Sequence, residues 1–248
     1  MQQGLKPGAK YMDTQSHSKN APLICPCCGG MEFSQSSVIW PELAAEWRLS
    51  PVELKCIDEQ QGSYCRTCGT NFRSMALAAA ISRTLGYSGM FSDIAVFLAA
   101  SGRRVLEINP AGSLTRFLSG YPGHVLATYP AVDITRLPYP DASFDLVIHS
   151  DTLEHIRHPE RALAECRRVL TKDGYCIFTV PILVDRLTLS REGMPNSYHG
   201  NPSDAASDYV VWSEYGADAW KQVLRAGFAE CRIFAFKYPS ALALVAVP

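Results

Sequence analysis

The stretch Val105–Leu118, VLEINPAGSLTRFL, decides how the rest of the chain is interpreted. Its first four residues form a mostly apolar run typical of a buried strand, and a turn with Pro110 and Gly112 follows before a helix-like segment. A strand that passes through such a turn into a helix is the repeating unit of α/β sheets, which bind ligands at the carboxyl ends of their strands. The stretch therefore indicates an α/β fold with a candidate ligand loop.

The alternation of strands and helices continues to the end of the chain. The pattern predicts strands over 124–128, 145–150 and 174–180 and helices over 159–171 and 216–227. The last two apolar runs, 229–238 and 241–248, are separated by a short link and are expected to pair antiparallel at one edge. We predict a doubly wound, mostly parallel seven-stranded sheet over residues 103–248, preceded by a helical lead-in over 73–102.

Length and composition describe a globular protein. The 248 residues suffice for one sizeable α/β domain and a small appendage, and the formal net charge of -1 gives no general attraction for polyanions. No apolar run approaches the roughly 18 residues that span a bilayer. Residues 1–20 are polar, expected to be flexible, and lack the apolar core of a signal peptide. These features predict a cytoplasmic location and no membrane contact, and leave the oligomeric state open.

Residues 21–72 are rich in cysteine and poor in apolar periodicity, so they need a cross-link or a metal to fold. In a reducing compartment such crowding favours a metal over disulfides. Two Cys-x-x-Cys pairs could offer zinc a tetrahedron of thiolates: Cys25, Cys28, Cys65 and Cys68. Four thiolates leave no open position, so we predict a structural zinc module, with Cys27 and Cys56 as alternate ligands. The alternative is that all six thiols are reduced and unligated.

A long segment after the opening stretch carries a family resemblance. Residues 132–181 read VDITRLPYPDASFDLVIHSDTLEHIRHPERALAECRRVLTKDGYCIFTVP. Together with the strand and turn from Val105, this series resembles the class I S-adenosylmethionine-dependent methyltransferases of the small-molecule branch. The resemblance covers roughly residues 105–181 and extends more loosely to Phe228. It implies a Rossmann-like methyltransferase domain with S-adenosylmethionine as its cofactor.

The resemblance also implies roles for single residues. Glu107, at the end of the first strand, would contact the methionine part of the cofactor through the turn. Asp133 would accept a hydrogen bond from the adenine amino group, and Ile134 would cover the ring. Ser150 begins the segment that walls the cofactor near its sulfonium.

Two features depart from the family pattern. Asn109 and Pro110 stand where the motif has glycine, which stiffens the turn, although Gly112 still lets backbone approach a ligand. The second strand normally ends in an acidic residue that binds both ribose hydroxyls, whereas here Thr128 and Tyr129 follow it. A hydroxyl can fill only part of that role.

Methyl transfer needs a general base only when the acceptor loses a proton on attack. His155, in LEHI, follows a strand close to the expected sulfonium, and its alternative role is to pack a helix end. Tyr198 and His199, in NSYHGNP, lie on a loop that the resemblance places over the acceptor pocket, where it could close on substrate. The alternative for His199 is an exposed histidine with no role.

The principal hypothesis is a methyltransferase that acts on a small-molecule or carrier-bound acceptor in a biosynthetic pathway. A zinc module before such a domain is also similar to certain ribosomal RNA guanine methyltransferases. The first 75 residues hold seven Lys/Arg and seven Asp/Glu, and this balance argues against a nucleic acid partner. A third hypothesis is a binding or regulatory protein that has kept the fold and lost the chemistry. The altered turn and the missing acid favour that alternative.

Overall fold

The computed structural model describes residues 22–198 and 209–248. Its main sheet has six strands in the order β4-β3-β5-β6-β10-β9. Their bounds are Val105–Ile108 (β3), His124–Ala127 (β4), Phe144–Ser150 (β5), Leu170–Thr179 (β6), Glu230–Lys237 (β9) and Ala241–Val247 (β10). Strands β4, β3, β5 and β6 run parallel to one another, and β10 pairs antiparallel with both β6 and β9. The α/β architecture and the antiparallel pair at one edge are thus confirmed.

The prediction of seven strands is not met, because the main sheet in the described part of the chain has six. After β4, residues 128–143 form turns and bends without a helix or strand. A further parallel strand would require a crossover connection of about a dozen residues or more, which this segment cannot hold in addition to the strand. Strand β4 is therefore an edge strand, and its Val125 and Leu126 are exposed.

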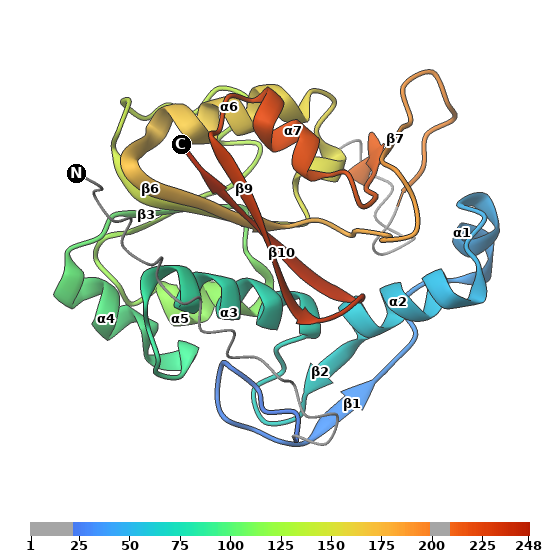
Figure 1. Cartoon of the computed structure of the whole chain (residues 1–248), viewed down its shortest axis with the longest axis horizontal. Coiled ribbons are helices and arrows are strands. Elements are labelled where there is room, and N and C mark those ends of the chain that lie inside the picture. The colour runs from blue at the N-terminus through green and yellow to red at the C-terminus, as the bar shows by residue number, and fades with distance from the viewer. Residues whose placement is uncertain (1–21, 199–208) are drawn as a thin grey trace, which may run out of the picture.

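Helices cover both faces of the sheet (Figure 1). One face carries α6 and α7 and the other carries α3, α4 and α5. These helices span Phe72–Leu85 (α3), Ile94–Ser101 (α4), Thr115–Leu118 (α5), Pro159–Val169 (α6) and Trp220–Arg225 (α7). Short 3-10 turns occupy Phe91–Asp93 (η1), Gly112–Leu114 (η2) and Leu153–His155 (η3). No helix in the described ranges is long and apolar enough to cross a membrane.

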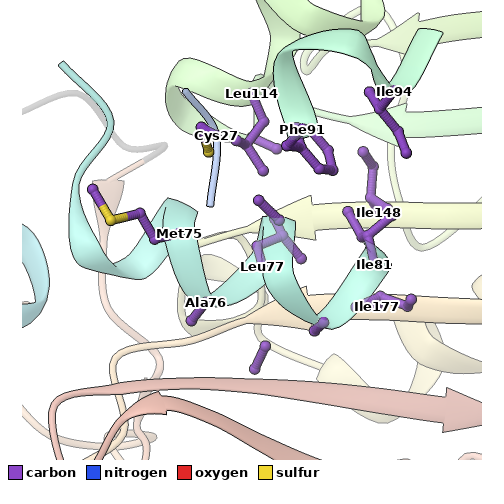
Figure 2. Close-up of a cluster of buried hydrophobic side chains, with 14 of the residues drawn as sticks. Cys27, Met75, Ala76, Leu77, Ile81, Phe91, Ile94, Leu114, Ile148 and Ile177 are labelled. Carbon is purple, nitrogen blue, oxygen red and sulfur yellow. The ribbon is translucent and has the colours of Figure 1, made fainter. Parts of the chain in front are cut away.

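The period-two pattern of β5 separates two cores. Leu146 and Ile148 face the cluster under α3, whereas Val147 faces the cluster under α6. Figure 2 shows the first cluster, in which Leu77 and Ile81 of α3 lie over Ile148 and the neighbouring strand. Each such fully buried aliphatic side chain stabilises the fold by about 1.5–3 kcal/mol.

The N-terminal part packs against the larger domain. It contains β1 (Phe33–Gln35), α1 (Pro41–Glu46), α2 (Pro51–Gly62) and β2 (Ser63–Cys65), and β1 pairs antiparallel with β2. The Trp47 indole donates to Ser197 Oγ at 2.8 Å, and Gln60 Nε2 donates to the Ser240 carbonyl at 2.7 Å. The short strands β7 (Leu189–Ser190) and β8 (Ser213–Glu214) pair antiparallel, and Ser197 lies between them in the sequence. These contacts join α1 and α2 to segments far along the sequence.

Candidate functional site

The loop after β3 is fastened to the end of β4. Asn109 has a φ of +54°, a left-handed conformation that asparagine tolerates better than most residues other than glycine. Its backbone N–H donates to the Ala127 carbonyl at 2.8 Å, and its Oδ1 accepts from the Tyr129 N–H at 3.0 Å. The structure thus brings Asn109 beside Thr128 and Tyr129 at the carboxyl ends of two adjacent strands.

Position 112 requires glycine because of its backbone conformation and because of the nearby Ser74 side chain. Its φ is +60°, and a Cβ built there would lie 2.7 Å from Ser74 Oγ. Ser74 belongs to the first turn of α3, whose N-cap Asn71 accepts a hydrogen bond from the Ser74 N–H at 2.9 Å. The absence of a side chain therefore lets the start of α3 close on the loop.

Glu107 lies under the loop and is fully buried. Its Oε1 accepts from the Ala111 N–H at 2.7 Å and from Thr115 Oγ1 at 2.6 Å, while Oε2 lies 2.7 Å from His124 Nε2 on β4. The carboxylate is used within the protein to shape the loop. His124 and Thr115 were not singled out from the sequence, although an acidic residue in a buried strand signals that such partners must exist.

The residues after β4 and β5 are placed differently from one another. Asp133 is exposed, and its Oδ1 accepts from both the N–H and the hydroxyl of Thr135 at 2.8 Å. Ile134 packs into the core under α6 with 3% of its surface exposed. The Ser150 hydroxyl is buried and lies 2.8 Å from Thr179 Oγ1.

A partly buried polar cluster that sequence reasoning missed lies beside the loop. The Arg73 guanidinium contacts both Asp151 and the Gln61 side-chain oxygen, and Gln61 Nε2 donates to Asp151 Oδ2 at 2.8 Å. Arg73 Nη2 lies 3.8 Å from where a Cβ on Gly112 would stand. Asp151 follows β5 with a φ of +44°. The cluster therefore joins α2, the start of α3 and the end of β5 next to the candidate cofactor loop.

A cavity of about 320 Å³ adjoins this cluster. Its lining is mostly apolar and comprises Val38, Ile39, Trp40, Trp47, Ile57, Gln61 and Pro181. All but Pro181, which follows β6, come from the N-terminal part.

The candidate bases lie near one short segment. His155 Nδ1 donates to the Val210 carbonyl at 3.1 Å, and its Nε2 lies 4.0 Å from Glu154 Oε1. Tyr198 forms a β-bridge with Val210, and its hydroxyl accepts from Asn196 Nδ2 at 3.3 Å. His199 lies outside the described residues. Because Ser197 bonds to Trp47, the segment before His199 borders the cavity.

The four cysteines of the two Cys-x-x-Cys pairs converge. Cys25 and Cys68 Sγ atoms are 3.6 Å apart, those of Cys28 and Cys65 are 3.7 Å apart, and all four lie within 4.8 Å of one another. Zinc–sulfur bonds of about 2.3 Å in a tetrahedron place sulfurs about 3.8 Å apart. The geometry and the donor set therefore fit zinc.

Two matching turns create this arrangement. Gly29 and Gly69 follow the pairs with φ values of +75° and +67°, and their N–H groups donate back to Cys25 and Cys65 carbonyls. Desolvation raises the pKa of Cys65, but backbone N–H bonds from Cys68 and Thr67 outweigh it and lower the pKa to about 7. Cys27 is outside the four-sulfur group and packs in the core.

Part of the chain, including the loop after β3, is similar in sequence to known proteins. Residues 88–178 match the family model described as methyltransferase domain. A Mycolicibacterium smegmatis protein described as a probable S-adenosylmethionine-dependent methyltransferase is 37% identical over 90 residues, which are 34% of each chain. The Halorhodospira halochloris sarcosine/dimethylglycine N-methyltransferase is 32% identical over 91 residues, 32% of this chain and 33% of that one. The matched part spans about a third of the length of these relatives.

Solved structures align over longer stretches with lower identity. The 1,6-didemethyltoxoflavin-N1-methyltransferase of Burkholderia thailandensis is 15% identical, with a TM-score of 0.36, over 69% of this chain and 85% of that one. The family model covers the segment that holds β3, β5 and the candidate cofactor loop. Residues 88–178 are therefore similar to a methyltransferase domain, and the relatives that match about a third of this chain are described as methyltransferases.

Proposed function

We propose that the chain transfers a methyl group from S-adenosylmethionine to a small-molecule or carrier-bound acceptor. The observation that carries the proposal is the meeting of three features at the carboxyl ends of β3, β4 and β5. These are the loop with left-handed Asn109 and Gly112, the Arg73–Asp151 pair, and the cavity that Gln61 of this cluster lines together with Pro181 after β6. Ligands of open parallel sheets bind at this end.

The residues around the loop fit the parts of this cofactor. The Arg73 guanidinium suits the methionine carboxylate, and Thr128 and Tyr129 offer hydroxyls to the ribose. Asp133 is exposed and retains an oxygen beyond the one that caps Thr135, so it can accept from the adenine amino group. When bound, the cofactor supplies an electrophilic methyl group on a sulfonium.

Other residues act by holding the site in shape. Glu107 acts through the loop that it braces, since its oxygens are bonded to Ala111, Thr115 and His124. Ile134 anchors the segment next to Asp133 from the core, and Ser150 joins the end of β5 to β6. Such bracing keeps the cofactor groups in place without reorganisation during binding.

The cavity suits an apolar or aromatic acceptor. Two indole rings, three aliphatic side chains and a proline can surround a flat ring, and the Gln61 amide can orient a polar substituent. Tyr198, His199 and His155 are the candidate bases for an acceptor that must lose a proton. Ser197, which directly precedes Tyr198, is bonded to Trp47 of the cavity lining.

We assign the four-cysteine cluster to structural zinc. The four sulfur atoms would fill the coordination sphere, so the metal would hold β1, β2 and the loops around them without binding a substrate. Since α2 connects this module to Gln61 and the cavity, the zinc would support the acceptor side of the site.

The cofactor assignment can be tested by calorimetric titration with S-adenosylhomocysteine, after a check that no ligand co-purifies. We expect a Kd of about 1 μM, or about -8 kcal/mol. The substitutions Arg73→Gln and Asp133→Ala should each weaken binding about 10-fold or more, equivalent to about 1.4 kcal/mol. Arg66→Gln, on an exposed pair in the same part of the chain, is the control.

The acceptor assignment needs a separate readout. Trp40→Ala should lower turnover of small aromatic acceptors while S-adenosylhomocysteine affinity stays within about twofold, because the indole lines the cavity and is not one of the proposed cofactor residues. A ligand-free protein that gives no binding heat would instead support the non-catalytic alternative. If the protein binds the cofactor but turns over none of the acceptors, the cofactor assignment stands and the assignment of the cavity as the acceptor site is rejected.

A further inference from the structure

Three chemically reactive side chains meet in the core, away from the candidate active site. His149 of β5, Cys176 of β6 and Cys166 of α6 are fully buried. One ring nitrogen of His149 and the two sulfur atoms all lie within 4.8 Å of one another. Val147 pairs with Cys176 in the sheet register, so His149 and Cys176 point to the same face, which α6 covers.

His149 has no hydrogen-bond partner for either ring nitrogen among the described residues. Its ring stacks on Phe178, with centroids 4.6 Å apart and planes inclined by 18°. Buried polar groups are normally paired, and an imidazole with two unused nitrogens in a core is unfavourable. A ligand for at least one nitrogen would remove this penalty.

We propose that His149, Cys166 and Cys176 form a second metal site that binds a thiophilic divalent cation, with Zn²⁺ as the best match. Two sulfurs and one imidazole nitrogen are ligands that zinc prefers, and the three donor atoms lie within 4.8 Å of one another, so small side-chain shifts would bring them around a common centre with bonds of about 2.0–2.3 Å. A divalent cation also neutralises two thiolates, which a buried site requires. The site shares no residue with the four-cysteine cluster.

The surrounding charges favour a cation. An imidazole ring nitrogen that carries no proton offers a lone pair to a cation. The fully buried Glu154 acts on the same ring with its negative charge. The adjacent Cys166 thiol and burial raise the pKa of Cys176 well above its usual value. Binding of one Zn²⁺ would convert both thiols to thiolates and release two protons.

The site would fix the strand that leads to the candidate active site. His149 directly precedes Ser150 and Asp151. A cation held from β5, β6 and α6 would therefore hold the end of β5 against the helix on the opposite face from Arg73.

The direct test is the zinc content of the full chain, purified anaerobically with a thiol reductant and measured by plasma mass spectrometry. We expect the wild type to hold one zinc more per chain than Cys166→Ala. Cys231→Ala is the matched control, because Cys231 packs near Cys176 but is outside the three-residue group. Equal zinc in the wild type and Cys166→Ala would overturn the proposal, as would a Cys166–Cys176 disulfide in the freshly isolated protein.

A second variant avoids dependence on thiol loss. His149→Phe retains an aromatic ring against Phe178 and removes both nitrogens. On titration of zinc-depleted protein with Co²⁺, it should lose about one bound cation and part of the thiolate-to-cobalt absorption. Wild-type cobalt stoichiometry and spectrum in a folded His149→Phe protein would exclude the histidine as a ligand.

Discussion

Glu107 on β3 and His124 on β4 meet across neighbouring parallel strands, with Oε2 2.7 Å from Nε2 and at most 5% of either side chain exposed. The same carboxylate binds the loop through Ala111 and Thr115. One buried acid thus joins an edge strand, the candidate cofactor loop and the first turn of α5. The arrangement explains why the loop keeps its shape with a single glycine.

Removal of this acid should therefore unfold more than one element. We expect Glu107→Ala to lower the free energy of unfolding by about 3–5 kcal/mol, because it leaves buried donors and an imidazole without their partner. Urea denaturation followed by circular dichroism measures the loss. Glu32→Ala removes an acid from the exposed pair with Arg66 and should change stability by less than about 1 kcal/mol. A similar small loss for both variants would contradict the bracing role.

Gly112 should tolerate no side chain while Ser74 is present. We expect Gly112→Ala to destabilise the protein by about 1–3 kcal/mol through its positive φ and the contact with Ser74 Oγ. The double variant Gly112→Ala/Ser74→Ala should recover the steric part and retain the backbone strain. Gly120→Ala, where a Cβ would meet nothing within 4 Å, serves as the control. Additive losses in this thermal-unfolding cycle would show that the two positions are independent.

The four-cysteine cluster should lose its metal when one ligand is removed. Cys28→Ser is expected to lower the zinc content by one per chain and to expose residues 22–72 to limited proteolysis, because three sulfurs bind zinc more weakly than four. Cys27→Ala changes the neighbouring cysteine outside the cluster and should retain the metal. Zinc loss in both variants, or in neither, would argue against the assigned ligand set.

The contact between α2 and the C-terminal half should weaken in acid. Hydrogen bonding from Arg186 lowers the pKa of Glu53 from about 4.5 to about 2, so its stabilising contribution is complete above about pH 4.5. That contribution, on the order of 1–3 kcal/mol, is lost as the pH falls towards 2. Glu53→Gln should therefore be less stable than the wild type at pH 7, with a smaller difference at pH 3. A difference that does not change with pH would show that the interaction is not ionic.

The order of strands and helices could be predicted from the sequence because it depends on local periodicity. Apolar runs such as those of β5 and β6 and the helix from Phe72 to Leu85 all have their signal within a few residues. The convergence of the four cysteines could also be predicted, because each Cys-x-x-Cys pair lies on one tight turn and two such turns suit a zinc site. The strand count was not predictable in this way, because it depends on whether residues 128–143 add to the sheet edge.

The partners of single side chains were decided only by the tertiary structure. Gln61, Arg73 and Asp151 meet because α2, α3 and the end of β5 pack together, and His149 meets two cysteines because α6 lies over the sheet. Short-range sequence patterns do not predict such contacts, because the contacts join residues that are distant in sequence. The sequence by itself determined the layers and the position of the loop after β3, whereas three-dimensional packing determined which side chains surround the cavity and which lie buried together.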